Sequence, residues 1–520
     1  MSEGTELPRA HPEGEQPQVE PSDEQPVAID TYSGRVQVAW DPDAAVTPLG
    51  QMAFFIAFLK ASGLFDNLVA ACPLHYTSPN APTRRDVPGT LLLSVLSGHR
   101  RYAHITALRA DTVNPPLLGM SRVLSEDAVR RAFEKIEAEA GVEWLREQLD
   151  YTVRPLLGEP WILDADTTVK PLYGEQEGAV AGYNPAKPGR PSHSYHSYMI
   201  ANLRLMLEVE VQPGNQTAPK HSAADLWSLL DRLGPGRQPA MLRGDNAWGT
   251  EAVMREAEQR RLPYLLRLRL TRNVTRAIER AMTGQWQPAG RGWEGQSIEL
   301  CLLGWSRQRR VVLLRRKFDR PLTVTEQGDD GQQSLSFATV DPRKRVWEFG
   351  ALVTSLDAEI LTLGQLYRDR ADCENDFDEL KNQCLSREAD QRGGFTTRDL
   401  KRCRLMARFV ALVFNWWNLF VRLADPDLHR EAITSRPLLL TAIAKPASHA
   451  GQTTIHVSSP HARHGWARAA LTRIGAFLET LRATAEQLTP LECWYRILSE
   501  ALVKYLKGRQ LDPPRRLRAA

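Results

Sequence analysis

The chain has 520 residues, too many for one hydrophobic core, so we expect two to four domains. Its 42% of hydrophobic and 25% of charged residues are ordinary for a globular protein, and its net charge of +4 permits nucleic-acid binding without requiring it. The six cysteines form no Cys-x-x-Cys pair and no Cys/His spacing suited to zinc, which argues against a structural metal and for a reducing, cytoplasmic compartment.

The N-terminal stretch is acidic and rich in proline, and it has neither the basic start nor the apolar segment of a signal peptide. We therefore predict a disordered leader over residues 1–44. The best candidate for a membrane span, residues 409–421, is shorter than the roughly 20 apolar residues that a span requires, and it contains Asn415 and Asn418. We interpret this stretch as a buried core helix.

Residues 45–155 show the apolar spacing of helices, and Ser125 is a predicted N-cap for a helix with acids in its first turn. Arg130 and Arg131 lie in that helix, where a helix-turn-helix would present them to phosphates or base edges. We predict a helical domain that binds DNA ends. A structural bundle with a solvated basic face explains these residues equally well.

Residues 156–272 change to short β runs, three in succession from Trp161 and then alternating with helical runs. This order predicts an α/β fold, a mixed sheet with helices on its faces, as the first part of a catalytic domain. Ligands of open α/β sheets gather at the carboxyl ends of strands, so acids at strand ends are candidate site residues.

Three aspartates occupy such places. Asp164 and Asp166 are two residues apart on one predicted strand and share a face, and Asp245 closes a later strand. Because an unpaired carboxylate inside a sheet is costly, at least one of the first two should meet a cation or strong donors. Taken singly, each acid could also be an ordinary turn or helix-cap aspartate.

Residues 273–350 return to short strands with glycine and proline at the breaks, which predicts a β-rich insertion. Basic and aromatic residues are interleaved there, a pattern typical of surfaces that follow a phosphate backbone and stack a displaced base. These residues are Arg307, Arg309, Arg310, Arg315, Arg316, Lys317, Arg320, Trp286, Trp293, Trp305 and Trp347. Tryptophans in the core and a solubilising arginine face are the alternative.

Residues 351–425 should hold the second part of the catalytic domain, and residues 426–520 a C-terminal helical region with a basic tail. If the stretch 367–381 is a helix, one narrow stripe carries a phenol, a guanidinium, a carboxylate and an ammonium. They belong to Tyr367, Arg370, Glu374 and Lys381, and Asp378 falls on the same stripe. Such a stripe suits a metal with a phosphate chain, although a salt-bridged, solvated helix face has the same pattern.

Two strand-end aspartates and a helical carboxylate can together hold two Mg²⁺ or Mn²⁺ ions at a phosphodiester. Geometry alone leaves open whether Asp164 or Asp166, and whether Glu374 or Asp378, belongs to this set.

These residues resemble a known family. Asp166 followed by two threonines, the strand-terminal Asp245 and the Tyr-Arg-Glu-Lys spacing at 367, 370, 374 and 381 resemble the DDE transposases of bacterial insertion sequences, in the branch defined by that signature. Residues 169–193 further resemble the insertion-sequence group thirteen-eighty. The resemblance spans about residues 45–425 and implies an RNase-H-like catalytic domain interrupted by the β-rich insertion.

The resemblance also implies roles. It selects Asp166, Asp245 and Glu374 as catalytic, metal-binding residues, and it assigns Tyr367, Arg370 and Lys381 to phosphates near the reacting DNA end. In relatives a tryptophan upstream of the signature helix stacks on a flipped base, and Trp347 is the nearest candidate. The basic loop residues Lys187, Arg190 and His193 are further candidates for DNA contacts, or a basic turn without a role.

We therefore expect a cytoplasmic bacterial DNA transposase that binds terminal inverted repeats of double-stranded DNA, cleaves them with two Mg²⁺ or Mn²⁺ ions and joins them to target DNA, as a homodimer in the synaptic complex. A decayed or domesticated transposase that binds DNA without cutting it is the first alternative. A stand-alone RNase-H-like nuclease is the second.

Overall fold

The computed structural model separates the chain into two compact units, Met1–Ala45 and Val46–Ala520. The residues that it describes are 26–39, 41, 43–78, 80–184, 187–217, 219–317, 347–370, 395, 397–459, 463–484 and 488–513.

The first unit contains a β-hairpin. Strands β1 (Val27–Thr31) and β2 (Gly34–Val38) pair antiparallel from Val27 with Val38 to Thr31 with Gly34. The Thr31 hydroxyl donates to the Gly34 carbonyl at 2.7 Å and closes the turn. The prediction of a disordered leader over residues 1–44 is therefore wrong for this part, because β-branched residues alternate with polar ones on both sides of a tight turn.

A ten-stranded mixed sheet dominates the second unit. Its strand order is β4-β5-β3-β7-β8-β12-β11-β10-β9, and β6 pairs with β5. The strands are β3 (Ile162–Pro171), β4 (Val180–Ala181), β5 (Pro191–Ile200), β6 (Leu205–Pro213), β7 (Met241–Gly244), β8 (Tyr264–Arg267), β9 (Gln287–Gly290), β10 (Trp293–Leu300), β11 (Arg309–Lys317) and β12 (Trp347–Thr354). Strands β3, β7 and β8 run parallel, and the other pairs are antiparallel. This confirms the predicted mixed sheet.

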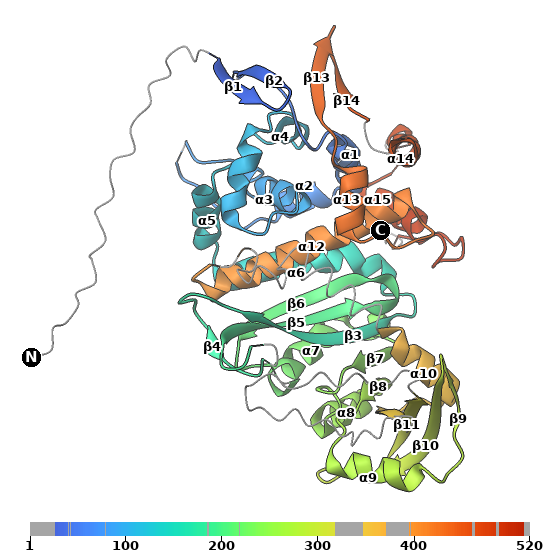
Figure 1. Cartoon of the computed structure of the whole chain (residues 1–520). Helices are drawn as coiled ribbons and strands as arrows, with labels where there is room; N and C mark the ends of the chain where they lie inside the picture. The colour runs from blue at the N-terminus through green and yellow to red at the C-terminus, as the bar shows by residue number, and fades with distance from the viewer. Residues whose placement is uncertain are drawn as a thin grey trace, which may run out of the picture. The chain divides into compact units, whose positions relative to one another are not determined.

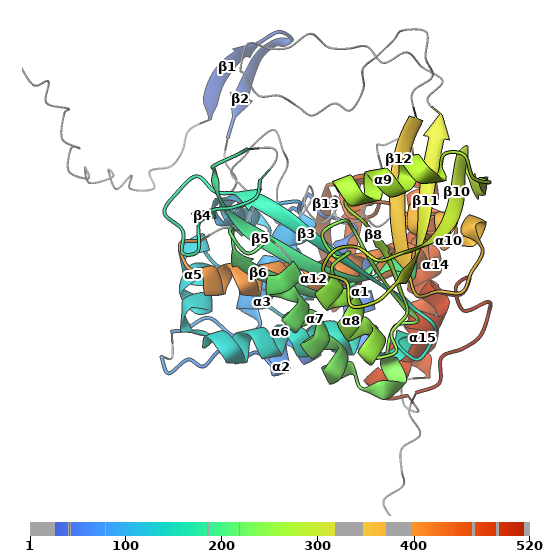
Figure 2. The same ribbon diagram turned by 90° about the horizontal axis from the view of Figure 1, so that it is seen from below.

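Strands β9 to β12, from the expected β-rich insertion, continue the sheet instead of forming a separate one. Leu352, Val353 and Thr354 of β12 pair with Arg267, Leu266 and Leu265 of β8. The parallel strands therefore lie in the middle of the sheet, with antiparallel strands on both sides (Figure 2).

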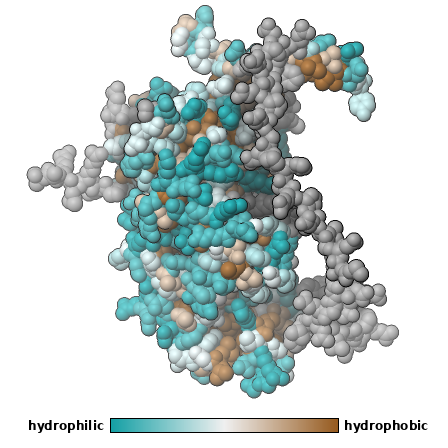
Figure 3. All heavy atoms as spheres, turned by 90° about the vertical axis from the view of Figure 1, so that its left-hand side faces the viewer, coloured by the Kyte–Doolittle hydropathy of each residue, from teal (hydrophilic) through white to brown (hydrophobic). Residues whose placement is uncertain are grey.

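Helices cover the sheet (Figure 1). Helices α6 (Ala138–Val153) and α12 (Leu400–Ala424) pack against β6. The remaining helices of the sheet region are α7 (Pro219–Leu233), α8 (Glu251–Gln259), α9 (Arg272–Ala281) and α10 (Ile360–Arg368), with short 3-10 turns at Arg154–Leu156, Ala201–Leu203 and Pro235–Arg237. On the face shown in Figure 3, hydrophilic residues predominate.

The N-terminal and C-terminal helical regions pack together. Phe55 of α1 contacts the rings of Trp417 and Phe420 in α12, and α1 also packs against α14 and α15. The N-terminal helices are α1 (Met52–Ser62), α2 (Leu64–Ala70), α3 (Asp86–Leu96), a 3-10 helix (Tyr102–Ala110), α4 (Asn114–Leu117) and α5 (Glu126–Lys135). The C-terminal elements are α13 (Ala432–Leu439), the hairpin β13 (Ala444–His449) with β14 (Gln452–Val457), α14 (His464–Ala483) and α15 (Pro490–Ala501).

Helix α12 is a buried core helix, as the apolar run at residues 409–421 predicts. Its polar side chains cover the edge of β6: the Asn415 amide accepts from Met206 N and donates to Met206 O, both at 2.7 Å, and Asn418 donates to Arg204 O at 3.0 Å. No single helix among the described residues is long and apolar enough to cross a membrane. Only α1 and α2 together pass that test, by length and composition, with a 68° bend between them.

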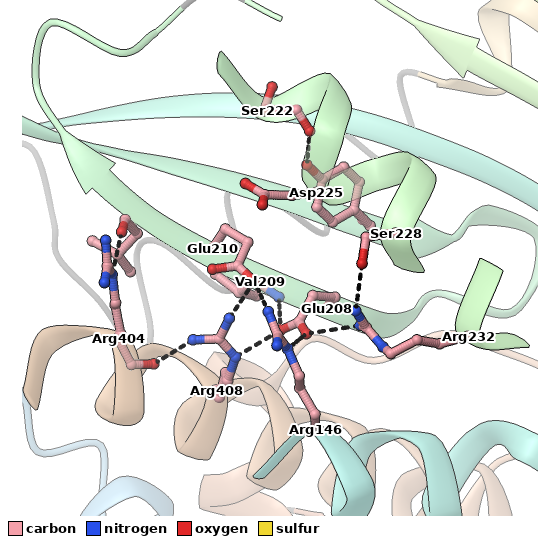
Figure 4. A network of polar contacts seen from close by, with 12 residues as sticks. Arg146, Glu208, Val209, Glu210, Ser222, Asp225, Ser228, Arg232, Arg404 and Arg408 are labelled. Carbon is pink, nitrogen blue, oxygen red and sulfur yellow. Dashed lines mark hydrogen bonds and ion pairs between the residues drawn. The ribbon is translucent and has the colours of Figure 1, made fainter. Parts of the chain in front are cut away.

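A buried ionic network also joins α12 and α6 to β6 (Figure 4). Arg408 of α12 contacts Glu208 at 2.8 Å and Glu210 at 2.5 Å, and Arg146 of α6 contacts the same two carboxylates. The network connects the helical region to the sheet that carries the candidate site.

Candidate active site

Asp166 and Asp245 lie side by side where the parallel pairing of β3 with β7 ends. The last registered pair between the two strands is Ala165 with Gly244; Asp166 is the next residue of β3, which continues to Pro171, and Asp245 directly follows β7. The two carboxylates are close enough for the charge of Asp166 to act on Asp245. The sequence predicts both acids at strand ends. Asp245 does follow β7, but the prediction is wrong for Asp166, because β3 stays paired with β5 as far as Pro171. The parallel register still places the two acids side by side.

Asp164 has a different environment. Its two oxygens accept from Nε and Nη2 of Arg243 at 2.6 and 2.7 Å, and both side chains are buried. Arg243 also donates from Nη1 to the carbonyl of Leu366 in α10, at 2.5 Å. Asp164 therefore forms a structural ion pair that fixes α10 beside the sheet, and with it the neighbouring Tyr367 and Arg370.

Arg370 forms an ion pair with Asp166. Its Nη2 donates to Asp166 Oδ1 at 3.0 Å, and only 2% of Arg370 is exposed. The sequence predicts that at least one acid of the Asp164–Asp166 pair meets a cation, and the structure gives each acid its own arginine.

The electrostatics of the site centre on Asp245. Burial raises the pKa of the Asp245 carboxyl, and the negative charge of Asp166 raises it further. The hydrogen bond from Ala247 N at 2.9 Å and the charge of Arg370 act in the opposite direction, but the pKa remains above its usual value. The raised pKa means that keeping Asp245 ionised beside Asp166 is unfavourable. A cation between the two carboxylates would offset this repulsion, so the pair is suited to a cation.

The residue after Asp166 is held from the neighbouring strand. Thr167 Oγ1 and His196 Nδ1 are 3.0 Å apart, and His196 Nε2 lies 2.8 Å from the carbonyl of Gln216. Burial lowers the pKa of His196 to about 4, so the ring is neutral near pH 7. A neutral ring that donates from Nε2 accepts the Thr167 hydroxyl at Nδ1, which fixes the strand next to Asp166.

A cavity of about 350 Å³ adjoins Arg370. Strands β10, β11 and β12 form one wall, and α10 forms another. Its lining residues are Arg267, Arg291, Trp293, Leu314, Arg316, Glu348, Gly350, Ala351, Leu352, Gly364, Tyr367, Arg368 and Arg370. Five arginines, a tyrosine and a tryptophan make this a basic, aromatic cavity, suited to an anion that carries a flat ring.

Trp347 is not among the residues that line this cavity. It pairs with Lys317 across the strands, whereas Trp293 and Glu348 pair with Arg316. Because side chains alternate along strands, Trp347 lies on the opposite face of the sheet from Trp293. Its ring contacts Arg315 and Lys317, with distances of 4.5 and 4.9 Å to the ring centroid. The structure therefore brings Trp293 to Tyr367 and Arg370, and the candidate Trp347 lies elsewhere.

The predicted DNA contacts of the basic loop divide into two kinds. Lys187 and Arg190 gather at Tyr173: the Lys187 ammonium is 2.7 Å from the phenol oxygen, and the Arg190 guanidinium lies 4.0 Å from the ring centroid. His193 is fully buried, and its Nε2 lies 2.7 Å from the carbonyl of Glu177. The expectation that His193 contacts DNA is therefore wrong, because the ring stabilises the loop from inside.

The two arginines of the predicted N-terminal DNA-binding helix lie on α5. Arg130 is within 3.5 Å of Glu126 and 3.3 Å of Asp127, and it lies 5.3 Å from the Tyr102 ring centroid. Arg131 is exposed. Of the two, Arg131 therefore has the more accessible side chain.

Glu374 and Lys381, together with the competing Asp378, lie outside the described residues. Within the described ranges no three His, Cys, Asp or Glu side chains gather closely enough to hold a metal ion. The neighbouring carboxylates of Asp166 and Asp245, the second with a raised pKa, nevertheless match the oxygen donors that Mg²⁺ and Mn²⁺ require.

One residue of the candidate site, Arg243, is absent from the sequence-based predictions, and another, Trp293, appears there only as one of four tryptophans of the insertion. Arg243 precedes Asp245 by two residues on the same strand, and a basic residue inside an apolar strand was a usable signal for a buried partner. Trp293 could be distinguished from Trp347 only with the strand register, which the sequence does not show.

Comparison with known proteins identifies the family. Residues 90–476, more than half of the chain, match the family described as transposase DDE domain group 1. Among solved structures, the chain is similar to a piggyBac transposase synaptic complex with hairpin DNA, studied by cryo-electron microscopy, with a TM-score of 0.38 and 11% identity over 89% of this chain and 86% of that one. A search of curated proteins found no match. On the strength of the family match, the chain belongs to the transposase DDE domain family, group 1.

Proposed function

We propose that the chain is a DNA transposase that binds terminal inverted repeats, cleaves DNA strands at the element ends and joins the 3′ ends to target DNA. The observation that carries the proposal is the pair Asp166 and Asp245, side by side where the parallel pairing of β3 with β7 ends, with Arg370 against Asp166. In a chain of the DDE transposase family, this is where phosphodiester chemistry would take place.

An RNase-H-like identity of the sheet is part of this proposal. The order β6-β5-β3-β7-β8 has three antiparallel strands in succession and then two parallel ones. This order supports the RNase-H-like fold, with strands β9 to β12 as the insertion before the signature helix. We retain the division into a DNA-end-binding region, 45–155, and a catalytic region split as 156–272 and 351–425, with residues 426–520 as the C-terminal region.

Asp166 and Asp245 would hold Mg²⁺ or Mn²⁺, with Glu374 as the proposed third ligand. When bound, two such ions activate the attacking water or 3′-hydroxyl and stabilise the leaving oxygen. The chain's own residues supply position and charge. Arg370 neutralises Asp166 in the DNA-free chain, and the Asp164–Arg243 pair keeps α10 beside the two carboxylates.

Tyr367, Arg370 and Lys381 would contact the DNA phosphates next to the reacting bond. The basic cavity supports a related role for Trp293, whose ring would stack on a displaced base, in the place first assigned to Trp347. Gly350 gives this cavity room, because a Cβ added there would meet only Leu314 Cβ, at 3.8 Å. Lys187, Arg190, Arg130 and Arg131 would add phosphate contacts, and pairing of two DNA ends would require a homodimer.

The test is strand cleavage of a duplex that carries the element's end sequence, taken from the DNA flanking the gene, with Mg²⁺ and with EDTA. Asp245→Asn should abolish cleavage and strand joining but keep binding to the same duplex, because it removes one carboxylate charge and leaves the shape unchanged. Asp369→Asn is the matched control, because Asp369 is an exposed acid next to Arg370. This variant should cleave DNA like the unchanged protein.

Cleavage by Asp245→Asn at the normal rate would contradict the proposal. Binding without Mg²⁺-dependent cleavage in the unchanged protein would favour a decayed transposase. Cleavage of any duplex, without strand joining, would favour a stand-alone nuclease.

A further inference from the structure

The hairpin β13–β14 takes almost no part in the hydrophobic core. Ala444 is its one buried residue, and most of the others are exposed. Figure 1 shows the hairpin projecting from the C-terminal helical region. An isolated two-stranded hairpin is at best marginally stable in water, so its projection into solvent needs an explanation other than packing.

The base of the hairpin is firmly attached. Ala444 and Thr47 exchange two backbone hydrogen bonds of 2.9 Å, and Gly50 N donates to Ala442 O at 2.8 Å. A hydrogen bond of 2.8 Å from Ser458 N to Ile443 O closes the other side. At the tip, Ala450 and Gly451 both have positive φ, of 48° and 75°, as a tight two-residue turn between paired strands requires. The hairpin is thus an arm that is attached to the helical region at its base.

The charged residues of the segment that contains this arm are all basic. Residues 432–478 contain no Asp or Glu, although the chain has 62 acids, and they include five Arg or Lys residues and four of the 12 histidines. Such a stretch has a net positive charge and complements a polyanion.

The register places the basic residues on one face. Lys445 pairs with His456, and His449 with Gln452, so these side chains point to the same side. The other face carries Pro446, Ile455 and the Ser448–Thr453 pair, whose hydroxyls are 3.1 Å apart. One face therefore offers a cation and several hydrogen-bond donors in a row.

From these observations we infer that the β13–β14 arm is a second DNA-contact element, whose Lys445–His449–His456 face lies against duplex DNA outside the cleavage site. A two-stranded ribbon fits the major groove, and its basic and amide side chains suit phosphates and base edges. The inference rests on the proposed function for the identity of the DNA.

The test is fluorescence anisotropy of the full chain with an element-end duplex and with a scrambled duplex of the same length, at several salt concentrations. Two variants probe the arm. In the first, Lys445, His449 and His456 are all replaced by Gln. In the second, residues 446–455 are replaced by Asn-Gly, which closes the Lys445–His456 pair with a two-residue turn.

Both variants should bind the end duplex about tenfold more weakly, and the salt dependence of the Gln variant should fall by about one ion, because Lys445 contributes one phosphate contact. The matched control is Ser448→Ala with Thr453→Ala, on the opposite face, which should bind like the unchanged protein. Circular dichroism and light scattering establish that each variant is folded and has the original oligomeric state.

Unchanged affinity of both variants would overturn the inference. A changed oligomeric state with unchanged affinity would also overturn it, since the arm would then contact a second copy of the chain. If the unchanged protein binds no end duplex, the proposed function fails first. If the unchanged protein binds and cleaves the end duplex, and the arm variants bind it equally tightly, the proposed function stands and the inference about the arm fails.

Discussion

At the scale of single residues, Asp164 and Asp166 show how two identical side chains on one face of a strand acquire different roles. Asp164 is fully buried and holds Arg243 with both oxygens. Asp166 lies farther along the same strand, beyond the pairing with β7; its side chain is 15% exposed, and its Oδ1 accepts from Arg370. A fully buried carboxylate that holds an arginine with both oxygens cannot leave its partner without a large cost, whereas a partly exposed carboxylate can exchange its partner.

This difference predicts a role for Arg370 that can be measured without catalysis. Arg370 neutralises Asp166 in the DNA-free chain and therefore competes with a divalent cation for that carboxylate. Arg370→Met should raise the affinity of the DNA-free protein for Mn²⁺ about tenfold, because a charge-assisted hydrogen bond no longer has to be broken. Mn²⁺ binding is measured by electron paramagnetic resonance, as the decrease of the signal of free Mn²⁺.

Arg368→Met is the control for this experiment. Arg368 lines the same cavity and bonds Gln365 at 3.0 Å, but it is not the partner of Asp166. Its Mn²⁺ affinity should match that of the unchanged protein. Equal affinities in all three proteins would show that Arg370 does not compete for the site.

At the scale of elements, α12 is predicted well as a buried helix, but its second role is not visible in the sequence. Asn415 and Asn418 argue against a membrane span, and the structure shows that they bond the backbone of β6. Side chains thus satisfy backbone groups that an edge strand would leave unpaired, and they block the addition of another strand.

Asn415→Leu tests this edge cover. The replacement puts an apolar side chain of similar size in place of the amide and leaves the N–H and C=O of Met206 buried without partners, which should lower the free energy of unfolding by about 2–5 kcal/mol. Urea denaturation gives this value. Asn418→Leu loses one bond to the backbone, to Arg204 O, and a longer one of 3.4 Å that its Oδ1 accepts from Arg422 Nε, and it should cost roughly half as much. A loss for Asn415→Leu no larger than that of Asn418→Leu would contradict the edge-cover role.

The elements also show where prediction from sequence ends. Period-2 alternation and turn residues predict strands, because both are local properties of the chain. The pairing of β12 with β8, and the opposite faces of Trp347 and Trp293, depend on register and on contacts between distant segments. For this reason the basic, aromatic residues, Trp293 among them, are predicted, but the sequence does not show which tryptophan faces the cavity.

At the scale of the whole molecule, the candidate site is assembled from segments far apart in sequence. Asp166 and Asp245 both lie just beyond the last pair of the parallel strands β3 and β7, so their juxtaposition could be predicted from the rule for parallel strands, although β3 itself continues to Pro171. The docking of α10 through the Asp164–Arg243 pair could not, because it depends on which of several arginines is buried. The same holds for the ionic network of Figure 4, in which α6 and α12 meet two glutamates of one strand.

That network is the basis of the last prediction. Burial by itself would raise the pKa of Glu210, but the charges and hydrogen bonds of Arg408 and Arg146 outweigh it, so the pKa lies below its usual 4.5. A lowered carboxyl pKa contributes stability above pH 4.5, and that stability is lost as the pH falls below this value. Arg408, with 0% of its side chain exposed, leaves two buried carboxylates short of a partner when it is replaced.

Arg408→Met should therefore lower the free energy of unfolding at pH 7 by about 3–5 kcal/mol, the usual cost of breaking a buried pair. The difference from the unchanged protein should shrink as the pH falls below 4.5, because Glu210 then loses the charge that Arg408 stabilises. Arg232→Met removes only a half-exposed arginine, 3.7 Å from Glu208, and should cost at most about 1 kcal/mol. Urea denaturation at pH 7 and at lower pH measures all three proteins. If Arg408→Met costs no more than Arg232→Met, or costs the same at every pH, the network does not hold the helical region to the ten-stranded sheet, and α6 and α12 depend on apolar packing alone.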